Sequence, residues 1–131
     1  MNDVDIQLIH STLTRHSGIE LAFVFGSVAQ GKARTDSDLD IAVQAAHALN
    51  TRQKMALIGD LAEATGRPVD LIDLRTVGEP LLGQILSYGR RLLGSDEAHG
   101  RLLNRHLIDA ADFLPLAQRI VDERRLAWIG K

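Results

Sequence analysis

The chain has 131 residues, of which 45% are hydrophobic and 24% charged, and its formal net charge is -2. This length predicts a single domain spanning residues 1–131, and the near-neutral charge argues against direct nucleic-acid binding through a basic surface. The absence of cysteine excludes disulfides and thiolate metal sites. The first ten residues lack the pattern of a signal peptide, and no apolar run approaches the roughly 20 residues of a membrane span. We therefore expect a cytoplasmic protein that makes no membrane contact.

The first third of the chain predicts a helix, a glycine turn and two strands. Apolar positions over residues 3–16 follow a helical pattern that closes near Gly18. The apolar run at 21–25 is too short for a helix and predicts a buried strand, and 39–43 predicts a second strand. Between them we expect a short helix at 27–31 and a polar loop at 32–37.

The rest of the chain predicts three further helical segments and two strands. Residues 51–65 carry a helical stripe with Thr51 as the expected N-cap, and Gly66 marks its end. A strand is predicted at 69–74, a short helix near 81–86 and a small edge strand at 91–93. A long helical tail begins at about residue 96, and Pro115 is expected to kink or split it. The fold class is therefore mixed α/β.

The most informative segment is Gly26 to Asp40, GSVAQGKARTDSDLD, which follows an apolar strand and leads into another. A tight turn into a helix start offers free backbone N–H groups to a phosphate. Residues two apart in an extended chain point to the same side, so Asp38 and Asp40 face one point. Paired carboxylates suit a hard divalent cation such as Mg²⁺. The pattern predicts a site for nucleotide chemistry.

A third carboxylate comes from the strand predicted at 69–74. If that strand lies next to the strand at 39–43, Asp70 joins Asp38 and Asp40, because neighbouring strands are only about 5 Å apart. Asp73 is three positions further along and faces the other way on a regular strand. Asp36 is expected to hydrogen-bond within its own loop.

Each motif also has a purely structural interpretation. A Gly-Ser pair alone is more often a turn and helix cap, and an Asp-x-Asp pair alone is more often part of a surface loop. Lys32 and Arg34 could meet phosphates or simply solvate the loop. The combination of strand, Gly-Ser, Asp-x-Asp, strand and a later Val-Asp is much more specific than either pair, and it favours a nucleotide or metal site.

At these residues the sequence resembles the minimal nucleotidyltransferase (MNT) group of the DNA polymerase β-like superfamily. The resemblance rests on GSVAQGKARTDSDLDIAV and GRPVDLIDL, and extends to EPLLGQILSYGRRLLGSD and ADFLPLAQRIVDERR. It implies a nucleotidyltransferase fold, with a small mixed sheet flanked by helices and a C-terminal helical tail. It also implies Mg²⁺ and the substrate ATP, with Asp38, Asp40 and Asp70 as catalytic metal ligands. Gly26 and Ser27 would lie at the triphosphate.

The tail of the chain is also similar to MNT proteins that act as antitoxins. The resemblance then implies a partner, a HEPN-family RNase toxin, onto whose tyrosine the antitoxin transfers AMP from ATP. Two alternatives stay open: an antitoxin that acts by binding alone, and a small-molecule nucleotidyltransferase.

The helical tail carries two apolar stripes, which is about twice what packing against one sheet requires. One stripe can cover the core of the domain, and the other is left for a partner helix. Phe113, Leu116 and Ile120 are the expected contact residues. In the alternative interpretation both stripes pack internally, with Pro115 folding the tail back.

Overall fold

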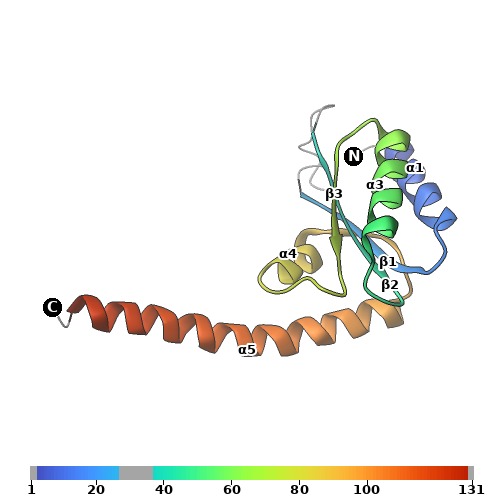
Figure 1. Ribbon diagram of the computed structural model, residues 1–131. Coiled ribbons are helices and arrows are strands. Elements are labelled where there is room, and N and C mark those ends of the chain that lie inside the picture. The colour runs from blue at the N-terminus through green and yellow to red at the C-terminus, as the bar shows by residue number, and fades with distance from the viewer. Residues whose placement is uncertain (1–2, 27–36, 130–131) are drawn as a thin grey trace.

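The computed structural model describes residues 3–26 and 37–129 (Figure 1). The helix expected at 27–31 and nearly all of the loop expected at 32–37 lie outside these residues. The elements in chain order are α1 (Asp3–Arg15), β1 (Ile19–Phe25), β2 (Leu39–Ala45), α3 (Thr51–Thr65), β3 (Val69–Asp73), α4 (Leu81–Tyr88), β4 (Arg90–Leu93) and α5 (Asp96–Ile129).

The strands form one mixed sheet in the order β3-β2-β1-β4. β1 is antiparallel to both β2 and β4, whereas β2 and β3 are parallel. The strands predicted from the sequence are all present, and β4 is the expected edge strand. The prediction that the second and third strands lie next to each other is confirmed.

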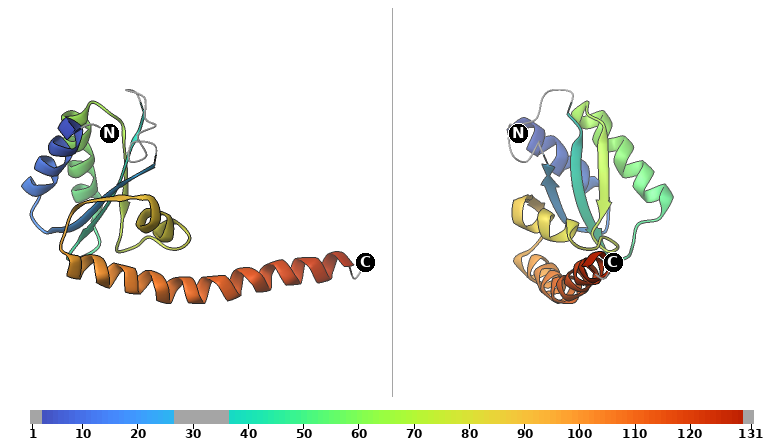
Figure 2. Two further views of the ribbon diagram at one scale, coloured as in Figure 1. Left: turned by 180° about the vertical axis from the view of Figure 1, so that it is seen from behind. Right: turned by 90° about the vertical axis from the view of Figure 1, so that its left-hand side faces the viewer.

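Helices cover both faces of this sheet, with α1 and α3 on one side and α4 and α5 on the other (Figures 1 and 2). Because side chains alternate along each strand, the buried residues divide into two clusters. The cluster under α1 and α3 contains Ile9, Leu13, Ala22, Val24, Leu39, Ile41, Val43, Leu57 and Leu61. The cluster under α4 and α5 contains Leu21, Phe23, Ala42, Leu74, Leu82, Ile85 and Leu102. None of the described helices combines the length and apolar character that crossing a membrane requires.

The N-cap of α3 is Asn50, so the expectation that Thr51 caps this helix was wrong. The Asn50 side chain accepts a hydrogen bond from the Gln53 backbone N–H at 2.8 Å, and the Asn50 backbone N–H donates to Gln53 Oε1 at 3.0 Å. This reciprocal pair satisfies two N–H groups, whereas a cap at Thr51 would place Lys54 at the matching position, and a lysine side chain has no acceptor for the return bond. The predicted end of the helix is confirmed, because Gly66 adopts φ 70° and donates to the Ala62 carbonyl at 2.8 Å.

Helix α5 runs through Pro115 without a break, so the expected split does not occur; the helix only curves gently (Figure 1). A proline removes one intrahelical hydrogen bond, here the one to the Ala111 carbonyl. Ala111 is exposed, so water can satisfy that carbonyl. The alternative in which Pro115 folds the tail back against the domain is therefore wrong.

Polar contacts from Arg105 and His106 hold the first third of α5 to the domain. Arg105 donates through Nη1 to the Leu74 carbonyl and through Nη2 to the Val77 carbonyl, the latter at 2.7 Å. His106 Nδ1 lies 2.6 Å from Oε1 of the nearly buried Glu79. These contacts fix the direction in which the rest of the helix leaves the domain.

Candidate active site

The parallel register of β2 and β3 places Asp40 directly beside Asp70. Directly paired residues of neighbouring strands point to the same face of the sheet, with the strands about 5 Å apart. Along that face, Ala42 and Ile72 follow the two carboxylates and belong to the cluster under α4 and α5. The predicted proximity of Asp40 and Asp70 is thus confirmed by the register.

Asp38 lies one residue before the start of β2 rather than within it. Its segment is tied to the start of β3: Arg67 Nη1 donates to the Ser37 carbonyl at 3.1 Å, and the Leu39 N–H donates to the Pro68 carbonyl at 2.7 Å. Sequence reasoning missed this role of Arg67, although its place just before the Val-Asp strand was the available signal. The contacts hold the chain that carries Asp38 against the strand that carries Asp70.

The three aspartates carry like charges, which repel one another. Asp40 is partly buried, and this burial, followed by the negative charges of Asp70 and Asp38, raises the pKa of Asp40 above its usual value. A bound cation would relieve both the burial cost and the repulsion. Among residues 3–26 and 37–129, however, no three acidic or histidine side chains are grouped closely enough to hold a metal ion as they stand.

Gly26 packs directly over the carboxylate of Asp40. The φ of Gly26 is +72°, a backbone conformation that residues with side chains rarely adopt. A Cβ at this position would lie 2.2 Å from Asp40 Oδ2. The neighbouring residue Phe25 pairs with Asp40 across β1 and β2. The glycine turn and the carboxylate therefore belong to one packed unit, while Ser27 lies outside the described residues.

Asp73 lies on the opposite face of the sheet, as its spacing from Asp70 predicts. It is buried, with Oδ2 accepting from the Leu49 N–H and Oδ1 from the Arg75 N–H, both at 2.8 Å. These bonds hold the connection that enters α3 and the turn that follows β3. Asp73 is a structural residue in this arrangement.

We expect Asp73→Asn to lower stability without disabling the site. The amide replaces one carboxylate oxygen by a donor, which leaves one partly buried backbone N–H without its acceptor and costs at least about 1 kcal/mol. Chemical denaturation would measure the loss, and nucleotide transfer per folded molecule should stay within about threefold of wild type. A large loss of transfer with unchanged stability would instead place Asp73 at the reacting groups.

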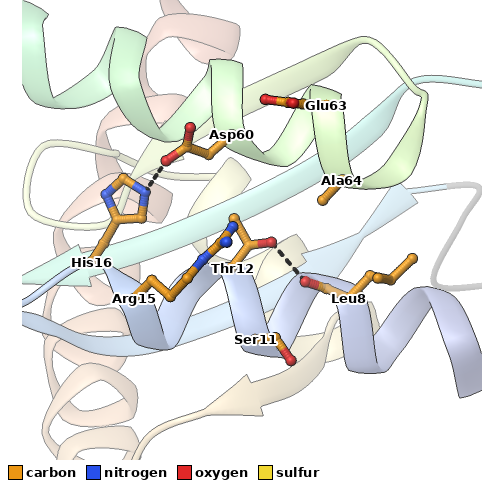
Figure 3. Close-up of a pocket in the computed structure, with 8 residues that line it drawn as sticks. All are labelled: Leu8, Ser11, Thr12, Arg15, His16, Asp60, Glu63 and Ala64. Carbon is orange, nitrogen blue, oxygen red and sulfur yellow. Dashed lines mark hydrogen bonds and ion pairs between the residues drawn. The ribbon is translucent and has the colours of Figure 1, made fainter.

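A separate groove of about 600 Å³ lies between α1 and α3, on the other side of the sheet (Figure 3). His16 Nε2 and Asp60 Oδ2 meet there at 2.7 Å, joining the end of α1 to α3. Although this groove is larger than the hollows beside α4, it lies on the opposite face of the sheet from Asp40 and Asp70, and its lining includes none of the predicted site residues. The contact between His16 and Asp60 connects the end of α1 to α3.

Comparison with known proteins supports the interpretation of this geometry. The chain is 38% identical over 79 residues to the protein adenylyltransferase MntA of Shewanella oneidensis, an alignment that covers 60% of this chain and 57% of that protein. The match thus spans less than two thirds of the curated relative's length.

Solved structures match over a greater length. One chain of a toxin–antitoxin crystal structure with AMP-PNP aligns with a TM-score of 0.82 and 29% identity, covering 92% of this chain and 98% of that one. A chain from the complex of a tri-AMPylated Shewanella oneidensis HEPN toxin with an MNT antitoxin aligns with a TM-score of 0.73 and 26% identity, covering 92% and 98%. These likenesses confirm the nucleotidyltransferase fold predicted from the sequence.

The profile of the family described as "Polymerase beta, Nucleotidyltransferase" matches residues 7–98. This match covers more than half of the chain and includes Gly26, Asp38, Asp40 and Asp70. The chain therefore belongs to the polymerase beta nucleotidyltransferase family.

Proposed function

We propose that this protein is an antitoxin that transfers AMP from ATP to a tyrosine of a HEPN-family toxin and so neutralises it. The observation that carries the proposal is the pairing of Asp40 with Asp70 beside the Gly26 backbone. The similarity to a protein adenylyltransferase and to a chain from a complex with a tri-AMPylated HEPN toxin supports this substrate class.

The donor set fits a Mg²⁺ ion, since carboxylate oxygens are its usual protein ligands and the like charges favour a cation here. Asp38, Asp40 and Asp70 would hold it. When bound, such an ion neutralises charge on the triphosphate and stabilises the leaving pyrophosphate. Arg67, through its bond to the Ser37 carbonyl, would keep the segment before β2 in place as Asp38 engages the ion.

The transfer itself requires the tyrosine oxygen to form a bond to the α-phosphorus of ATP while the bond from that phosphorus to pyrophosphate breaks. The tyrosine proton must leave, and Asp70 is exposed beside Asp40 and is a suitable acceptor. Backbone N–H groups at the Gly26 turn would meet the phosphates, together with Ser27. The remaining requirement is a protein that presents its hydroxyl to this end of the sheet.

Transfer can be followed with ATP labelled at the α-phosphate, incubated with this protein, Mg²⁺ and a candidate HEPN-family protein. We expect label to appear on the HEPN protein and pyrophosphate to be released in equal amount. Inhibition of the RNase without any label on it would favour an antitoxin that acts by binding alone. Label on a small acceptor, with none on protein, would favour a small-molecule nucleotidyltransferase.

A further inference from the structure

The apolar stripe that attaches α5 to its own domain continues beyond the domain. Its first members are buried or partnered, since Leu102 packs in the core and His106 meets Glu79. Further along the same face, Phe113 is 38% exposed, Leu116 47% and Ile120 43%. The C-terminal part of α5 projects past the domain (Figures 1 and 2). The apolar face of α5 is thus covered by the domain at Leu102 and exposed to solvent at Leu116 and Ile120.

A groove begins where this stripe passes α4. It has a volume of about 280 Å³, and its lining includes Gly83, Gln84 and Tyr88 of α4 and His106, Ala110 and Phe113 of α5. Gly83 permits this close approach, because a Cβ there would lie 2.8 Å from Cε1 of His106. A second hollow of about 300 Å³ continues along α5, where Asp109 and Asp112 lie beside Phe113 and Leu116. The two hollows share Glu79 and Phe113 in their linings, and together they are here called the α4–α5 groove, which has an acidic edge.

The α4–α5 groove lies on the same side of the sheet as the paired carboxylates. At the end of α4, a Cβ on Gly89 would lie 3.3 Å from the Val24 carbonyl, so this end of the helix meets the last residues of β1. The next residue of β1, Phe25, pairs with Asp40. A protein seated in the groove therefore lies along a surface that leads to the candidate active site.

We propose that the α4–α5 groove docks a helix of the protein that carries the acceptor tyrosine. The exposed apolar residues of α5 are spaced three and four apart, so their side chains form the ridges against which a second helix can pack. The docked helix should carry Lys or Arg at the positions that face Asp109 and Asp112. The inference rests on the proposed function, which requires a protein acceptor within reach of Asp40 and Asp70.

The test compares two double variants of the full chain. Phe113→Asp with Leu116→Asp places two charges in the groove, whereas Leu107→Asp with Ile108→Asp places them on side chains of α5 that are 66% and 57% exposed and lie outside it. Binding to the HEPN-family partner would be measured by calorimetry and light scattering. We expect affinity to fall about 100-fold or more for the groove variant and to change less than about threefold for the control.

ATP binding and circular dichroism of the same proteins separate docking from chemistry. The groove variant should bind ATP with wild-type affinity and keep its helix content, and the single variant Ile120→Asp should weaken partner binding with the same selectivity. Normal partner binding by the groove variant would overturn the docking proposal, as would its unfolding while Ile120→Asp has no effect. Loss of self-association instead of partner binding would identify a second copy as the occupant. If the groove variant alone loses partner binding but the wild-type protein transfers no AMP, the docking surface stands and the proposed function fails.

Discussion

Asp40→Asn is expected to reduce AMP transfer by about 100-fold or more while leaving the fold intact. The substitution removes a charge but almost no volume, and the stabilisation of a phosphoryl-transfer transition state by a metal is worth several kcal/mol, at about 1.4 kcal/mol per tenfold in rate. Asp70→Asn should behave similarly, because Asp70 is the direct neighbour of Asp40 in the sheet. Initial rates of label transfer from ATP would measure both losses.

The same variant should be at least as stable as the wild-type protein in the absence of metal. The raised pKa of Asp40 means that the folded protein disfavours the ionised carboxylate, so at pH above the folded pKa this group lowers the stability. Asparagine removes that cost, and the advantage should disappear in acid, where the carboxyl group is protonated in both states. Asp60→Asn, on the other side of the sheet, is the matched control for transfer and should retain wild-type rates. Near-normal transfer by Asp40→Asn would contradict the assignment of the site.

Gly26→Ala is expected to lose transfer activity nearly as completely as the Asp40 variant. The added Cβ would lie 2.2 Å from Asp40 Oδ2, so the carboxylate must leave its position or the turn must move. The backbone at φ +72° adds a further cost of about 1–2 kcal/mol for any residue with a side chain. The valine variant should be at least as severely affected. Transfer rates and denaturation curves would be measured on the same preparations.

Gly66→Ala separates the two causes. Gly66 has nearly the same φ, 70°, but a Cβ there meets nothing within 4 Å. This variant should therefore show the backbone cost in its stability and keep its rate of transfer. If the two alanine variants lose equal stability and both transfer normally, contact between the Gly26 turn and Asp40 has no role in catalysis.

The parts predicted well from the sequence are those that depend on local periodicity and strand pairing. The short apolar runs around the Asp-x-Asp and Val-Asp motifs predicted neighbouring strands, and in the sheet Asp70 lies beside Asp40. The opposite orientation of Asp73 followed from the alternation of side chains along a strand. A carboxylate pair at the ends of adjacent strands can thus be inferred from residue spacing once the strands are recognised.

The features that the sequence did not predict have different physical causes. The Asn50–Gln53 capping pair was readable from the sequence, but Thr51 offered a competing cap one residue later. The bond from Arg67 to the Ser37 carbonyl joins residues 30 positions apart. The continuity of α5 through Pro115 depends on the exposure of the helix to water, which periodicity alone cannot establish.

Intact-mass spectrometry of the HEPN-family partner tests the central claim most directly. The partner would be incubated with ATP and Mg²⁺ together with either the wild-type protein or Asp40→Asn, then separated and assayed for RNase activity. We predict that the wild-type protein adds one or more AMP units to the partner and that the modified RNase stays inactive after separation, whereas the variant adds none. A partner whose mass is unchanged, and whose RNase activity returns once the wild-type protein is removed, would contradict the account.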